Sequence, residues 1–151
     1  MTSPNRRHLL ALGGAFAVAA AHAAGAEPVN DGTWSDQALW PVLKKTRLTT
    51  DANGLIRAAF APEVTALANK PMTISGFILP IEATSHKHYI LSRYSPECPF
   101  CPSGGPTEVI EVFLNKPLGP TSAMVTIKGV FSTQNNMEAG LFYRMKDAAL
   151  V

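Results

Sequence analysis

The residues whose type and spacing could do chemistry in this chain are its two cysteines, Cys98 and Cys101. They lie in the segment SPECPFCPSGGP, which is rich in proline and glycine. A C-x-x-C pair of this kind serves as a redox dithiol, as half of a metal site or as a small structural disulfide. The residues around the pair narrow these uses but do not select one.

A metal site is the first interpretation. Two residues between cysteines is the spacing of a zinc knuckle, and zinc prefers a tetrahedral set of cysteine and histidine ligands. His86 and His88 precede the cysteines in the order H-x-H-x9-C-x2-C, and if both were extended they would share one face of a strand. A strand that starts at His88 would span about 20 Å in seven residues. The spacing therefore favours the cysteine pair with one further ligand, which is a histidine, a partner's ligand, Glu97 or Glu108.

A redox dithiol is the second interpretation. The sequence CPFC after an apolar segment is similar to the start of a glutaredoxin, in which a strand leads into the motif. That chemistry places the first cysteine at a helix N-terminus, where the helix dipole lowers the thiol pKa. Here Pro102 to Pro106 contains two prolines and two glycines, which are poor helix formers. The expected fold is therefore not thioredoxin-like.

A disulfide between Cys98 and Cys101 is the third interpretation. It would close a loop of four residues, for which the chain-entropy estimate is about 2 kcal/mol. Its effect would be to stiffen an exposed loop, and a rigid exposed loop is a suitable recognition surface.

Residues 1–26 have the pattern of an export signal. Arg6 and Arg7 precede an apolar run from Leu9 to about Ala21, and A-x-A patterns follow it. The paired arginines are typical of the twin-arginine route. The run is shorter than the roughly 18 apolar residues of a membrane-spanning helix. We therefore expect residues 1–26 to be a twin-arginine-type signal peptide and residues 27–151 to form a single β domain in the periplasm, without a membrane span.

The compartment and the charge limit the partners. Removal of the signal takes two of the 13 lysines and arginines and leaves 11 against 11 acidic residues. A net charge near zero argues against nucleic acid as a partner. The periplasm permits disulfides, whereas a reduced cysteine pair could load metal in the cytoplasm before export.

Turn residues and apolar patterns predict a mainly β chain. We expect a short helix within 34–43 capped by Ser35 or Asp36, a hairpin at Asn53–Gly54 and a helical turn that begins at Pro62. Strands are expected at 72–82, 88–94, 108–114, 124–132 and 141–145, with a loop at 133–140. Gly76 and Gly129 lie within strands and favour sharp bends. The predicted fold is a small OB-like, partly open barrel of five to six strands with one or two short helices, and a β-sandwich is the alternative.

Four segments carry a resemblance to a known family. ISGFILPIE, LSRYSPECPFCPSGGPTEVIEV, IKGVF and GLFYRM resemble an exported proteobacterial family that is classed only as a domain of unknown function. Some members are encoded beside ABC transporters linked to metal, especially zinc, homeostasis. The resemblance implies a periplasmic accessory protein with an OB-like fold. The residues that match the family's CPFC-x-GGP motif are Cys98, Cys101, Gly104, Gly105 and Pro106, whereas His86 and His88 match nothing clearly.

We therefore expect a periplasmic binding or accessory protein rather than an enzyme. It would present the cysteine loop to zinc or another metal, or to a partner such as an ABC transporter or another envelope protein. The alternatives are a thiol–disulfide oxidoreductase of non-thioredoxin fold and an interaction module with a structural disulfide. The candidate metal ligands are Cys98, Cys101, His86 and His88, and the candidate binding loop contains Pro99, Phe100, Gly104, Gly105 and Pro106. No catalytic residue is expected.

Overall fold

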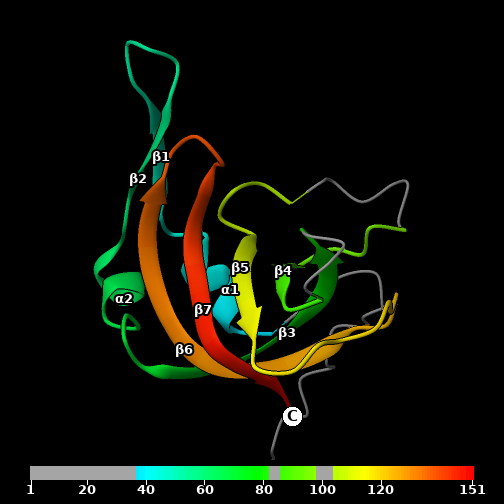
Figure 1. The fold of residues 1–151 in the computed structure, drawn as a ribbon. Helices are drawn as coiled ribbons and strands as arrows, with labels where there is room; N and C mark the ends of the chain where they lie inside the picture. Colours follow the sequence, from blue (N-terminus) through cyan, green and yellow to red (C-terminus); the bar gives the residue numbers. More distant parts are fainter. Residues whose placement is uncertain (1–36, 82–85, 98–103) are drawn as a thin grey trace, which may run out of the picture.

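The computed structural model of this chain describes residues 37–81, 86–97 and 104–151. Within these residues, seven strands form a two-stranded hairpin and a closed five-stranded barrel, and two short helices lie beside the barrel (Figure 1). The elements are, in chain order, α1 (Leu39–Leu43), β1 (Arg47–Thr50), β2 (Ile56–Ala59), α2 (Pro62–Thr65), β3 (Pro71–Pro80), β4 (His88–Ser92), β5 (Val109–Leu114), β6 (Val125–Asn136) and β7 (Leu141–Leu150).

The barrel has the strand order β3-β4-β5-β7-β6 and closes where β6 pairs with β3. β5 and β7 run parallel, and the other neighbouring strands run antiparallel. This is the Greek-key arrangement of an OB-like barrel. The prediction of a small, mainly β barrel with one or two short helices is confirmed, and the barrel closes fully.

Closure of the barrel depends on the middle of β3. This strand pairs with β6 as far as Gly76 and with β4 from Phe77 onward. A Cβ atom on Gly76 would lie 2.6 Å from the carbonyl oxygen of Ser92 and 3.0 Å from Cγ of Leu91. Glycine therefore allows β4 to approach β3 where β3 changes partner. Gly129, the second strand glycine singled out in the sequence, lies on β6 between Lys128 and Val130, where the register with β7 shifts.

We expect Gly76→Ala to lower the free energy of unfolding by about 1–3 kcal/mol, because the added methyl group meets backbone that cannot move freely. Gly119→Ala is the matched control, since nothing lies within 4 Å of a Cβ atom at that position. The control should change stability by less than about 0.5 kcal/mol. Urea denaturation measures both values, and equal stabilities of the two variants would show that β3 and β4 can separate at no cost.

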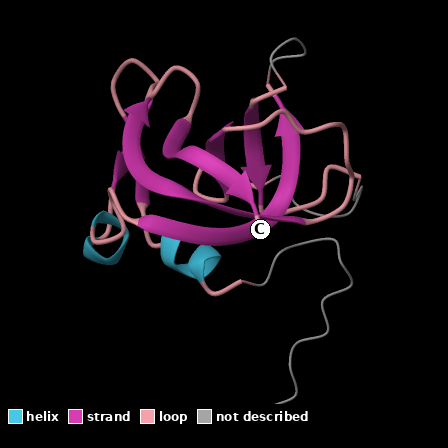
Figure 2. Ribbon diagram, turned by 60° about the horizontal axis from the view of Figure 1, so that its bottom comes forward, coloured by secondary structure: helices cyan, strands magenta, loops and turns pink. Residues whose placement is uncertain are grey.

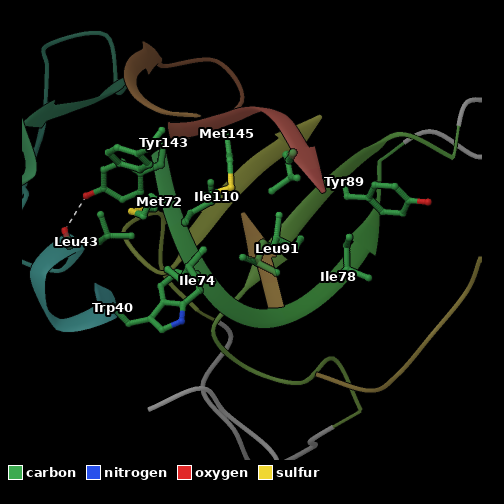
Figure 3. Packing of buried hydrophobic residues seen from close by; sticks show 14 of the residues in the cluster. Trp40, Leu43, Met72, Ile74, Ile78, Tyr89, Leu91, Ile110, Tyr143 and Met145 are labelled. Carbon is green, nitrogen blue, oxygen red and sulfur yellow. Dashed lines mark hydrogen bonds between the residues drawn. The ribbon is translucent and has the colours of Figure 1, made fainter. Parts of the chain in front are cut away.

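The core fills the barrel and extends under the two helices, which lie together on one side of it (Figure 2). Trp40 and Leu43 of α1 and Val64 of α2 have no exposed surface. Figure 3 shows Trp40 beside Ile74 of β3. Indole Nε1 of Trp40 donates to the carbonyl oxygen of Ser75 at 2.9 Å. The helix α1 therefore covers the part of β3 that β4 does not reach.

Local turn chemistry was predicted correctly. The hairpin of β1 and β2 turns through Gly54 with a φ of 81°, and Asp51 Oδ1 accepts hydrogen bonds from the backbone of Asn53 and Leu55. Pro62 is at the start of α2, where its missing N–H costs nothing.

The structure differs from the sequence prediction at the start of α1 and at the ends of β6 and β7. Ser35 and Asp36 lie outside the described residues, and the N-cap of α1 is Ala38, which makes no side-chain capping bond. The first half of the expected loop at 133–140 is strand, because β6 continues to Asn136, and only residues 137–140 form the turn. The last strand runs to Leu150 rather than to residue 145.

Within the described residues, no helix has the length and hydropathy needed to cross a membrane.

Candidate functional site

The cysteine motif lies in the connection between β4 and β5. Cys98, Pro99, Phe100 and Cys101 lie outside the described residues, so the structure shows the two flanks of the motif and not the motif itself. The flanks are Arg93 to Glu97 on one side and Gly104 to Glu108 on the other.

Glu108 joins the two flanks. Its carboxylate accepts hydrogen bonds from Nη1 of Arg93 at 2.9 Å and from the hydroxyl of Tyr94 at 3.1 Å. Nζ of Lys44, from the segment after α1, lies 3.1 Å from the same oxygen. The backbone N–H of Arg93 also donates to the carbonyl oxygen of Glu108 at 3.1 Å. The two flanks therefore form the base of the cysteine loop, and this base is held together by main-chain and side-chain hydrogen bonds.

The charge of Glu108 is maintained although the side chain is mostly buried. Burial alone would raise the pKa of this carboxyl group, but the hydrogen bonds from Arg93 and Lys44 outweigh it and hold the pKa below its usual value. Glu108 is therefore ionised where it joins the two flanks of the motif. Its engaged oxygens make it a poorer metal ligand than the sequence alone suggested.

Gly105 to Glu108 form a turn. The backbone N–H of Glu108 donates to the carbonyl oxygen of Gly105 at 2.8 Å, and Pro106 follows Gly105, which suits the second position of a β-turn. The N–H of Gly105 points to Oε2 of Glu108 at 3.4 Å. The glycine-rich segment therefore offers this N–H to the protein's own carboxylate.

The two candidate histidines have different surroundings. His86 precedes β4 and has a φ of 47°, so it is not extended as shared placement on one strand face would require. His88 is on β4, and its Nε2 lies 2.9 Å from Oε1 of Glu111. Its ring stacks on Phe113 at 4.4 Å between centroids. Among the described residues, no group of three or more histidine, cysteine, aspartate or glutamate side chains is placed to hold a metal ion.

His86 instead borders a pocket next to the start of the motif. The pocket has a volume of about 660 Å³. It contains both His86 and Glu97, and Glu97 directly precedes Cys98 in the sequence. We call it the loop pocket, and the described residues that line it are Ile78, Leu79, Pro80, His86, Tyr89, Pro96, Glu97, Leu118, Gly119, Pro120, Thr121 and Ser122.

A second polar cluster, on the outer face of the barrel, was not predicted. Oε2 of Glu111 accepts bonds from Nε of Arg144 at 2.7 Å and from Nε2 of Gln134 at 2.8 Å, and Oε1 meets His88. Burial would raise the pKa of Glu111, but the hydrogen bonds from Gln134, Arg144 and His88 hold it below the usual value. The guanidinium of Arg144 also lies 5.4 Å from the ring centre of Phe113.

This cluster joins β4, β5, β6 and β7 on the face that OB-like barrels often use for ligands. The alternation Val109, Glu111, Phe113 in the sequence indicates that these residues share one strand face. Nothing in the sequence shows that Arg144 is their neighbour. Because the oxygens of Glu111 already have donors, we assign the cluster to structure rather than to ligand binding.

The fold and its loops define a class of protein: a small OB-like barrel with a C-x-x-C loop between its second and third strands. No family model matches the chain, and no curated protein matches it. The crystal structure of a DUF3299 family protein from Pseudomonas aeruginosa PAO1 superimposes with a TM-score of 0.49 and 18% sequence identity. The superposition covers 62% of this chain and 67% of that protein.

Proposed function

We propose that this protein is an exported accessory protein of the periplasm, reached by the twin-arginine route, and that it is not an enzyme. In this proposal it binds zinc through Cys98 and Cys101 and presents the ion to a partner in the envelope, such as an ABC transporter. Zinc is here the cargo or a bridging ion.

The fixed base of the cysteine loop is the observation that carries the proposal. Arg93, Tyr94 and Lys44 all bond to Glu108 at that base. A pair of ligands held by fixed flanks loses less conformational entropy on binding than a pair on a free chain. Knuckle spacing and thiolate ligands fit zinc better than they fit hard cations such as magnesium or calcium.

His86 fits the remaining ligand position best. It lines the loop pocket beside the start of the motif, and imidazole nitrogen is a common zinc ligand. His88 is bonded to Glu111 and stacked on Phe113. We therefore assign His86 rather than His88 to the zinc site.

To test the proposal, the full-length sequence is expressed and the protein is recovered from the periplasmic fraction without oxygen. Zinc and free thiols are then measured on the same sample. About one zinc per chain with both thiols protected is expected. Changing Cys98 and Cys101 to serine should abolish binding, and His86→Ala should weaken it. His88→Ala is the matched control and should leave the affinity unchanged. Because thiolates are the binding form, affinity should fall on acidification.

Two results would contradict the zinc proposal. Undiminished zinc binding by the double serine variant would place the metal elsewhere. A disulfide without metal would favour one of the two alternatives, and its reduction potential would separate them. A value below roughly −300 mV is typical of a structural bridge, and a higher value of an oxidoreductase.

A further inference from the structure

The loop pocket has an apolar floor. Tyr89 is 3% exposed and Ile78 is 6% exposed, and both lie at the end of the barrel that is far from Trp40 (Figure 3). Leu118 and Pro120 form part of the wall. The volume of about 660 Å³ is within the range of roughly 300–1,000 Å³ that is usual for binding pockets.

The walls of the loop pocket are fixed in place. The hydroxyl of Tyr89 lies within hydrogen-bonding distance of two carbonyl oxygens, that of His86 at 2.8 Å and that of Leu118 at 2.5 Å. The N–H of Leu118 donates to the same carbonyl of His86 at 3.0 Å. These bonds hold His86 in a left-handed conformation, with a φ of 47°, that non-glycine residues adopt rarely. The concave shape is therefore built into the fold and does not depend on a ligand.

One wall has exposed backbone groups that make no backbone hydrogen bond to any other described residue. Residues 119–122 form neither helix, strand nor turn, and they belong to the long β5–β6 connection on the right of Figure 1. Within the described part of the chain, the C=O groups of these residues and the N–H groups of Gly119, Thr121 and Ser122 make no backbone hydrogen bond, and Pro120 has no N–H. Exposed backbone groups without such bonds can pair with an added extended chain.

The rim of the loop pocket carries a negative charge. Glu97 is exposed, and none of the ion pairs between described residues involves it. A cationic group on a ligand could therefore pair with Glu97 without displacing a partner of the protein.

We propose that the loop pocket binds an extended peptide segment of a partner protein, with an apolar side chain over Tyr89 and a basic side chain beside Glu97. The peptide backbone pairs with residues 119–122. Backbone pairing combined with a side-chain pocket is how extended peptides are recognised. This inference deepens the partner-binding part of the proposed function and rests on it, because a peptide held here lies beside the cysteine loop.

The experiment titrates the protein, expressed from its full-length sequence, with two blocked five-residue peptides and follows its amide and methyl NMR signals. One peptide alternates valine or leucine with lysine, and the other has glutamate in place of lysine. The lysine peptide should shift the signals of Gly119, Thr121, Ser122 and Ile78. It should bind about fivefold more tightly to the protein than to Glu97→Gln, which is the size expected for an exposed ion pair.

Gly119→Trp should block the loop pocket while the fold is kept, because nothing lies within 4 Å of a Cβ atom there. Lys116→Trp is the matched control, since Lys116 is exposed on the same connection and does not line the pocket. We expect the first variant to lose the peptide-induced shifts and the second to keep them.

Three outcomes would overturn the inference: no shift with either peptide at millimolar concentration, unchanged binding by Gly119→Trp, or equal binding of free indole, which would indicate a small-molecule pocket. The double serine variant of Cys98 and Cys101 separates this test from that of the proposed function. It should lose zinc and keep the peptide, so failure of one proposal is distinguishable from failure of the other.

Discussion

Trp40→Ala is expected to lower the free energy of unfolding by about 3–5 kcal/mol, which is the usual cost of removing a large buried aromatic side chain. Trp40 has no exposed surface, and its indole lies against the part of β3 that pairs with β6 and not with β4. The change would leave a cavity at that position and would also remove the hydrogen bond to the carbonyl oxygen of Ser75. Urea denaturation followed by circular dichroism measures the effect.

Two further variants separate the contributions of Trp40. Trp40→Phe keeps one aromatic ring in the core and loses the N–H donor and part of the indole volume, so it should cost less than the alanine variant by at least about 1 kcal/mol. Pro41→Ala alters an exposed residue of the same helix and should have a small effect. A cost below about 1 kcal/mol for Trp40→Ala would mean that α1 is not part of the cooperative unit.

The elements that the sequence predicted well are those specified by local chemistry. The turn at Asn53–Gly54 needs a residue that accepts positive φ, and Pro62 suits the first position of a helix, so a few neighbouring residues decide each of them. β6 was predicted too short because its end, Thr133 to Asn136, is polar. Those residues form strand through pairing with β7, as between Asn136 and Leu141, and such pairing is not a local property.

In the candidate site too, the sequence predicts contacts between neighbouring segments and not those between residues far apart in the chain. Arg93 and Glu108 flank one loop, so their proximity follows from the β4–β5 connection. Lys44 reaches Glu108 only because the barrel brings the segment after α1 to that end of β5. The conditional placement of His86 and His88 on one face failed because His86 precedes the strand and is held by Tyr89. Hydrogen bonds from distant residues, which periodicity does not encode, decide these positions.

Glu111→Ala is expected to lower the free energy of unfolding by about 2–4 kcal/mol. Loss of one member of a buried ion pair leaves the other charge without its partner, which typically costs about 3–5 kcal/mol. The side chain of Arg144 is 29% exposed, and water therefore recovers part of this cost. The change also removes the acceptor for Gln134 and His88. Glu138→Ala removes an exposed carboxylate and is the matched control, with an expected change below about 0.5 kcal/mol.

The pH dependence of stability gives an independent test of the Glu111 cluster. Because the pKa of Glu111 is lower in the folded protein than in the unfolded chain, the folded state is favoured when this group is ionised. Its contribution is fully present well above the unfolded pKa of about 4.3 and is lost as the pH falls through the lower, folded pKa. The difference in stability between the wild type and Glu111→Ala should therefore shrink as the pH falls from about 6 to below 4. A difference that stays constant over this range would show that the carboxylate contributes through packing and not through its charge.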